Sequence, residues 1–384
     1  MRNGLGLYIG VVQFFFATTW TLYVIYLPQL AGQAGIGREW VPWILVADQV
    51  VFAITDVATG FWIDRVRAGV ARLGGWIMAV TVLSSAAFLA LPYLNLTPGL
   101  LLGAIFVWAI TSSALRSPPW ALLSRYAAQP SVPWLATLVL TGSALAAAMA
   151  PYLGIALRGV DPKVPFVLST ITLLASVAGL VYAERRISTG TAMAEEEKPA
   201  GRKPLAVLAF FFALLLMAAG FQVHFSLNSA PRYLELAPAS RLPYLMPVFW
   251  IGFNLAMLGS SALVKRLGVF ESMAVAAGAG TLAMYCATLA SNLDSLLVCE
   301  FLAGGCWGLA CVAAYSGAIG FGRGGRTGRF LGALFATFAI AAFARIAAYA
   351  SDMIVDREIK MLLPWIPPLL WIVSAVLLVP VARR

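Results

Sequence analysis

Residues 41–63 read VPWILVADQVVFAITDVATGFWI, a run of 23 residues in which only Asp48 and Asp56 are ionisable. About 20 apolar residues are enough for a helix to cross the hydrocarbon core of a bilayer. Only a helix satisfies its backbone hydrogen bonds within such a segment, so this stretch predicts a transmembrane helix. Its two aspartates are candidate functional residues, because a charged side chain at membrane depth is costly unless it is paired or hydrated.

The composition of the whole chain resembles that of this stretch. Of the 384 residues, 61% are hydrophobic and 11% are charged, whereas soluble domains have roughly 45–50% apolar and about 25% charged residues. These values exclude a soluble globular protein and a disordered one, and they predict an integral membrane protein. The four cysteines have no CxxC spacing and lie in or beside apolar runs, so we expect packing residues rather than disulfides or metal ligands.

Eleven further runs of similar length and composition give twelve predicted transmembrane helices and an all-α membrane protein. The other five in the N-terminal half are Leu5–Leu27, Leu73–Leu94, Gly99–Leu123, Trp134–Leu157 and Val164–Ala183. The six in the C-terminal half are Leu205–Leu227, Leu242–Val264, Ser272–Ala290, Ser295–Phe321, Phe330–Ser351 and Met361–Val381. The loops of the two halves follow a similar sequence of lengths, which indicates two pseudo-symmetric six-helix bundles. We predict domains at 1–183 and 205–384, joined by a polar linker at 184–204.

The distribution of basic residues predicts the orientation. The N-terminus, the even-numbered loops and the C-terminus carry 17 Lys and Arg, while the odd-numbered loops carry 7. By the positive-inside rule both termini are cytoplasmic, in what we expect to be a bacterial inner membrane. The remaining two, Arg116 and Arg345, lie within predicted helices, so no basic cluster remains for nucleic acid.

The end of the second predicted helix carries a motif, Asp56-Val-Ala-Thr-Gly60-Phe-Trp-Ile-Asp64-Arg65, or DxxxGxxxDR. It resembles the motif of the major facilitator superfamily between helices 2 and 3, and a degenerate copy, Ser261-Ala-Leu-Val-Lys265-Arg266, lies at the same place in the second half. The resemblance implies a twelve-helix transporter that works by alternating access. It also implies an inner latch formed by Gly60, Asp64, Arg65, Arg67 and Arg125.

Within that superfamily the chain most resembles the glycoside-pentoside-hexuronide cation symporters, through DxxxG and Pro119-Trp120-Ala121-Leu122-Leu123. Their cation site has two aspartates four residues apart. Here the second aspartate matches Asp56, but the first position is Phe52, and Gln49 replaces an arginine. Proton coupling, sodium coupling and no ion coupling therefore all remain open.

The ionisable residues inside predicted helices are the candidate coupling groups. From the rise of about 1.5 Å per residue, Asp56 and Arg116 should share a depth in the inner half. They are expected to meet, either as a static ion pair or as an acid whose proton or cation competes with the arginine. The family resemblance implies that helices 2 and 11 flank each other across the interface between the halves. Asp48 and Arg345, both in the outer half, are therefore a candidate extracellular gate bridge, with Glu300 near Arg345 or His224. Imidazole titrates near neutral pH, so His224 is either a proton relay or an inert, hydrogen-bonded side chain.

Polar and aromatic residues on four predicted helices are candidates for lining a central cavity. They are Gln13, Trp20, Tyr23, Gln222, Asn228, Asn254 and Tyr315. Rings of this kind can stack on a sugar or hold a planar ligand, although a tyrosine near the membrane surface is equally an interface anchor.

Together these features predict a monomeric secondary transporter for a small organic solute, either an organic anion or a glycoside, driven by H⁺ or Na⁺ and surrounded by lipid. No Walker, HExxH or GxSxG motif is present, so we expect no enzyme, cofactor or metal centre. One alternative is an efflux transporter for amphipathic compounds, which predicts that Asp56 neutralises Arg116. Another is a non-transporting membrane receptor or assembly factor on the same fold.

Overall fold

The computed structural model describes residues 2–66, 73–126, 129–188 and 204–382, and this part of the chain is helical without strands. The N-terminal half contains α1 (Arg2–Gln33), α2 (Val41–Val66), α3 (Leu73–Ala90), α4 (Pro98–Ala114), α5 (Pro118–Tyr126), α6 (Val132–Ala156) and α7 (Lys163–Ser188). The C-terminal half contains α8 (Pro204–Val223), α9 (Ser229–Leu236), α10 (Leu242–Leu245), α11 (Pro247–Leu267), α12 (Val269–Leu289), α13 (Leu293–Phe321), α14 (Thr327–Ala350), α15 (Arg357–Leu362) and α16 (Ile366–Ala382).

These elements correspond to the twelve predicted membrane crossings. Ten spans are long and apolar enough to cross a bilayer, and two shorter apolar helices, Gly74–Ala90 and Ile366–Val381, occupy the positions of the third and twelfth. The protein is thus an integral membrane protein. The proposed domain boundaries stay a prediction: α7 continues to Ser188, five residues past the expected end of the first domain, and most of the linker lies outside the described residues.

Two of the crossings are interrupted near ionisable residues. The fourth is split into α4 and α5, because Pro118 and Pro119 lack the N–H groups that would continue α4. Arg116 lies in the break between α4 and α5. The seventh changes to a π-helix at His224–Asn228, between α8 and α9. Such single-turn π-helices are frequently found at functional sites.

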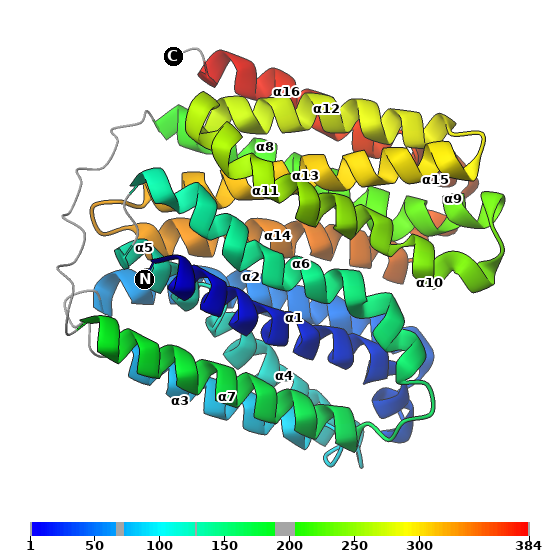
Figure 1. The fold of residues 1–384 in the computed structure, drawn as a ribbon. Coiled ribbons are helices and arrows are strands. Elements are labelled where there is room, and N and C mark those ends of the chain that lie inside the picture. The colour runs from blue at the N-terminus through cyan, green and yellow to red at the C-terminus, as the bar shows by residue number, and fades with distance from the viewer. Residues whose placement is uncertain (1, 67–72, 127–128, 189–203, 383–384) are drawn as a thin grey trace.

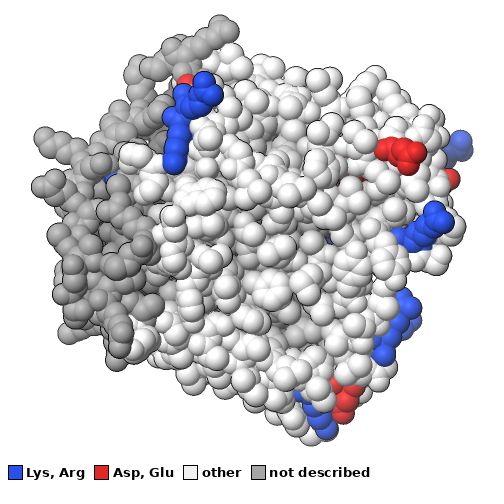
Figure 2. Space-filling view, viewed as in Figure 1, with Lys and Arg blue, Asp and Glu red and all other residues white. Residues whose placement is uncertain are grey.

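The helices run between two ends of the molecule, which we call the inner and the outer end. The inner end is the one where α1 begins and α16 ends, and α9, α10 and α15 lie at the outer end (Figure 1). On the face shown in Figure 2, Lys, Arg, Asp and Glu lie along the outer end and also at the upper left, near the inner end, and a broad uncharged band lies between. That band fits the hydrocarbon region of a membrane. The cytoplasmic location of the inner end remains a prediction from the basic residues.

The two halves meet most closely along α2 and α14. A Cβ on Gly60 would lie 2.4 Å from the carbonyl oxygen of Gly328, and one on Gly332 would lie 2.4 Å from the carbonyl oxygen of Asp56. Backbones come this close only where side chains are missing, as at other small-residue seams between membrane helices. The glycine at position 60 of the motif therefore has a steric function: it lets α2 contact the backbone of α14.

We expect Gly60→Ala and Gly332→Ala to loosen this seam, because the added methyl group must push a carbonyl oxygen away. Overpacking of this kind costs about 1–3 kcal/mol. Thermal unfolding in detergent should show a lower midpoint for both variants. Gly278→Ala in α12 is the matched control, since nothing lies within 4 Å of its added Cβ. If the seam variants unfold at the same temperature as this control, the close contact does not exist.

Candidate functional site

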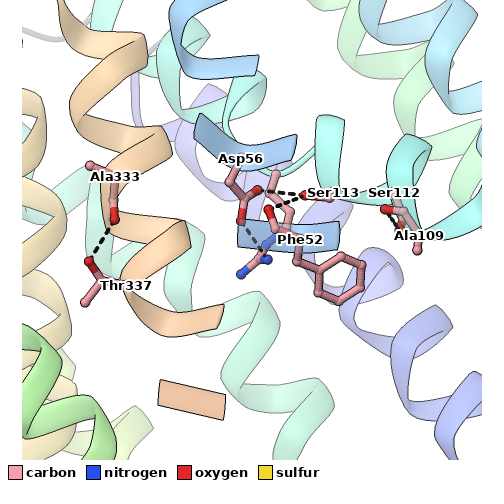
Figure 3. A network of polar contacts seen from close by, with 8 residues as sticks. Phe52, Asp56, Ala109, Ser112, Ser113, Ala333 and Thr337 are labelled. Carbon is pink, nitrogen blue, oxygen red and sulfur yellow. Dashed lines mark hydrogen bonds and ion pairs between the residues drawn. The ribbon is translucent and has the colours of Figure 1, made fainter. Parts of the chain in front are cut away.

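A buried ion pair joins the second and fourth crossings within the N-terminal half. Arg116 Nη1 donates to Asp56 Oδ2 at 2.9 Å; the side chain of Asp56 is 0% exposed and that of Arg116 is 20% exposed. Ser113 Oγ lies 2.9 Å from Asp56 Oδ1 and 3.2 Å from the carbonyl oxygen of Phe52. Figure 3 shows the Asp56 carboxylate directed at Ser113. Both partners stabilise the ionised carboxylate, and the arginine's charge is neutralised inside its own half.

Aromatic rings connect this pair to the C-terminal half. The Arg116 guanidinium lies 5.5 Å from the ring centre of Phe52 and 4.9 Å from that of Phe335 on α14. Next to it, Trp120 on α5 stacks on Tyr315 of α13 with ring centres 4.0 Å apart. Cation–π and stacking contacts contribute about 0.5–2 kcal/mol each. The site is therefore held across the halves by ring contacts rather than by an exchange of ions.

At the inner end, Asp64 connects α2 to the start of α14. Its carboxylate accepts hydrogen bonds from the backbone N–H groups of Gly328 (2.7 Å) and Arg329 (3.1 Å), and Arg329 Nε lies 3.3 Å away. The first N–H groups of a helix have no partner within the helix and carry its positive partial charge, so a carboxylate stabilises this terminus. Among the predicted latch residues, Arg65 is exposed at the end of α2. Arg67 and the Arg125 side chain lie outside the described residues.

The predicted bridge between Asp48 and Arg345 is not formed in this structure. Asp48 Oδ2 instead accepts a hydrogen bond from Tyr23 Oη at 2.7 Å, inside the N-terminal half. Arg345 is half-buried on α14, and its Nε has no hydrogen-bond partner among the described residues. The two helices do flank each other, as expected, but their close contact lies toward the inner end. An extracellular gate bridge forms only when the outer end is closed, so this pairing stays a prediction.

Of the two partners expected for Glu300, the structure brings His224 to it. His224 Nε2 lies 3.2 Å from Glu300 Oε2, and both side chains are buried in the C-terminal half. Ser229 Oγ lies 2.8 Å from Glu300 Oε1. The four outer ionisable groups thus form separate contacts in the two halves rather than one cluster.

The expected cavity-lining residues are divided among several environments. Tyr23 is fully buried, with Trp108 at 4.5 Å between ring centres, and Trp20 stacks on the same Trp108 at 6.1 Å. Tyr23 therefore belongs to an aromatic core of the N-terminal half, while Trp20 is partly buried and also contacts Phe52. That these two line a cavity stays a prediction. Gln13 lines a void of about 10 Å³ within the same half, beside Thr81 and Leu115.

The expected residues of the C-terminal half also make local contacts. Asn228 Nδ2 donates to the carbonyl oxygen of Leu363 (2.8 Å), and Asn254 Nδ2 donates to that of Trp250 (2.8 Å). Gln222 is half-buried on α8. Tyr315 contacts the opposite half through Trp120, which makes it the member of this set that lies between the halves.

Sequence reasoning missed Ser113 and Phe335 at the Asp56–Arg116 pair, and Ser229 at the His224–Glu300 pair. Ser113 lies three residues before Arg116, so one helical turn places both beside α2, and this spacing was a usable signal. Phe335 comes from the other half and carries no such signal. Ser229 is five residues after His224, and that spacing brings the two together only in a π-helix.

Comparisons with known proteins identify the fold. The sequence matches no family model and no curated protein. A bacterial homologue of the iron transporter ferroportin, in an outward-facing state, is 14% identical; the match covers 99% of this chain and 100% of that one with a TM-score of 0.75. The human organic anion transporter MFSD10 is 12% identical, with 100% and 98% covered and a TM-score of 0.70. The E. coli fucose:proton symporter FucP is 15% identical, with 98% of each covered and a TM-score of 0.63. The chain therefore has the major facilitator fold, as its DxxxGxxxDR motif indicated.

We expect Asp56 and Arg116 to be strongly coupled in a double-mutant cycle. Arg116→Gln leaves a buried carboxylate without its counter-charge, and losing one partner of a buried pair costs about 3–5 kcal/mol. Asp56→Asn should also destabilise the protein, whereas the double variant should recover a large part of the combined loss. Equilibrium unfolding of all four forms in detergent tests this. Additive effects within about 0.5 kcal/mol would contradict the coupling.

Proposed function

We propose that this protein is a secondary transporter that moves a small organic solute between its two halves by alternating access. The observation that carries the proposal is the distribution of charge about the seam. Asp56 with Arg116, and His224 with Glu300, each pair within one half. The halves meet through glycine backbones, rings and the Asp64 contact at the inner end. Asp64 is the exception, since its side chain is 5% exposed and pairs with Arg329 across the seam at the inner end. The two central pairs keep their partners when the halves separate, whereas leaving a buried charge unpaired would cost several kcal/mol.

The contacts at the inner end support an assignment of this conformation as outward-facing. There, α2 closes against α14 through the backbone seam between Asp56 and Gly328 and through the hydrogen bond from the Gly328 N–H to Asp64. In the outer half of the same two helices, Asp48 and Arg345 make no contact with each other in the described structure. The ferroportin homologue with the same fold was solved in an outward-facing state. Release of the solute at the inner end would require the hydrogen bonds between Asp64 and the start of α14 to break.

Arg345 supports an organic anion as the solute. Its guanidinium is half-buried on α14 with Nε unpartnered, whereas Arg116 is already neutralised by Asp56. A carboxylate on the solute would satisfy Arg345 with charge-assisted hydrogen bonds. A hexuronate combines such a carboxylate with a sugar ring. This agrees with the name of the organic anion transporter of the same fold.

Efflux of amphipathic compounds remains the second candidate, because a specific observation favours it. That function predicts a neutralised Arg116, and the Asp56 contact at 2.9 Å provides this. The rings of Phe335, Trp120 and Tyr315 around the pair would offer apolar surface to such a compound.

Uptake into proteoliposomes tests the proposal. We expect radiolabelled glucuronate to enter protein-containing vesicles faster than empty ones, and Arg345→Gln to reduce the rate at least about tenfold, since a charged hydrogen bond is worth about 1.5–3 kcal/mol. Arg357→Gln, an exposed arginine at the outer end, is the matched control. Methyl β-galactoside and the cationic dye ethidium are parallel probes. Transport of ethidium alone would favour efflux, and transport of none of the three would contradict the assignment.

A further inference from the structure

The C-terminal half contains a buried acid–base pair that lies away from the contact between the halves. His224, on the π-helix after α8, is 4% exposed, and Glu300, on α13, is 1% exposed. Nε2 of the histidine and Oε2 of the glutamate lie 3.2 Å apart. Neither atom has a well-oriented hydrogen bond among the described residues. Burying polar atoms without hydrogen bonds is costly. A proton placed between these two atoms would give both of them a hydrogen bond.

The π-helix brings a serine into this pair. The Ser229 backbone N–H donates to the His224 carbonyl oxygen five residues earlier, which is the π-helical bond. Ser229 Oγ lies 3.0 Å from that carbonyl and 2.8 Å from Glu300 Oε1. A hydroxyl has one proton to donate and can also accept a hydrogen bond. Ser229 can therefore donate to Glu300 when the carboxylate is ionised, and can accept from Glu300 when it is protonated while donating to the carbonyl oxygen of His224. The serine has a hydrogen bond available in both protonation states of Glu300.

A cavity connects the pair to the outer end. It has a volume of about 430 Å³ and is lined by His224 and Glu300, by Asn228 and Ser229, and by residues of α9, α12 and α15 and of the short helix at Met353–Val355. Its wall includes Lys360, which is exposed, and the partly exposed Arg232, paired with Glu235. Tyr233 and Cys299 are the other titratable groups that interact with Glu300. Water can therefore reach the pair from the outer end.

We propose that His224 and Glu300 form a proton-binding site in the C-terminal half, which exchanges one proton with water through this cavity. The proton adds to a nitrogen or oxygen of the pair, raises its net charge by one and returns to water when it leaves. Asp56 is less suited to this function, since it already has Arg116 as a counter-charge 2.9 Å away. That the proton drives solute movement rests on the transporter function proposed above.

A proton fits this site better than a metal ion. The described residues include no group of three or more His, Cys, Asp and Glu side chains that could hold a metal. A proton needs no ligand shell and can pass along water.

The single histidine of the chain makes a direct test available. The full protein, labelled with ¹⁵N-histidine and with its purification tag removed, is placed in nanodiscs and titrated from pH 5 to pH 9 by NMR. We expect one imidazole signal that titrates. In Glu300→Gln this titration should change, because the imidazole loses the carboxyl group 3.2 Å from its Nε2. Infrared difference spectra over the same range report the carbonyl band of a protonated Glu300, which Glu300→Gln would remove.

Glu358→Gln is the matched control, an exposed glutamate at the same end that does not line the cavity. It should leave both the NMR signal and the infrared band unchanged. His224→Gln provides a second variant, in which the carboxyl band should move even if Glu300→Gln fails to fold. If neither the imidazole nor a carboxyl group titrates between pH 5 and pH 9, or if Glu300→Gln and His224→Gln behave like Glu358→Gln, the proton site does not exist.

Vesicle experiments separate this inference from the transporter assignment. We expect an imposed proton gradient to raise glucuronate accumulation several-fold in the unsubstituted protein but not in Glu300→Gln. If none of the three solutes is transported but the pair titrates, the proposed function fails and the proton site stands. If transport still follows the proton gradient in Glu300→Gln and His224→Gln, the coupling function is wrong while the transporter assignment stands.

Discussion

The rest of the structure depends on the backbone contact between α2 and α14. Gly60, Gly328 and Gly332 let the carbonyl groups of one helix lie where a Cβ of the other would be. Asp64 then reaches across to the unpaired N–H groups at the start of α14. A steric condition and an electrostatic one thus act within two turns of the same helix. Both must be met for the inner end to be closed, which gives a physical reason for the spacing of glycine and aspartate in the motif.

This seam is tight in shape but involves little buried charge, and that combination suits a contact that must also open. Asp56 lies against the seam with its backbone, while its carboxylate is directed back into its own half toward Ser113 and Arg116. The cross-half ion pair of Asp64 with Arg329 lies at the inner end, where the Arg329 side chain is 47% exposed and that of Asp64 is 5% exposed. Opening the inner end would expose Asp64, and water could then replace Arg329. A buried ion pair across the seam would instead hold the halves in one state.

The two buried pairs, Asp56 with Arg116 and His224 with Glu300, share a second property: each lies where a regular α-helix is interrupted. Arg116 follows the end of α4, where prolines prevent continuation, and His224 begins the π-helix. An interruption removes some of the regular i to i−4 backbone hydrogen bonds of the helix. It also rotates the side chains after the interruption about the helix axis, relative to those before it. In the first case it lets an arginine turn toward Asp56. In the second it places Ser229 against both the carbonyl oxygen of His224 and the carboxylate of Glu300.

The sequence by itself determined that this is a membrane protein of twelve crossings, because the length and apolarity of each run are local properties that the bilayer fixes. It also placed Asp56 and Arg116 at one depth, since helical rise converts residue number into distance. Only the tertiary structure decided which groups touch at that depth. Asp48 bonds to Tyr23 rather than to Arg345, and Phe335 reaches Arg116 from the other half, because rotation about the helix axis and packing between halves depend on contacts distant in sequence. Likewise, the π-helix over His224–Asn228 that places Ser229 against His224 and Glu300 became visible only in the structure.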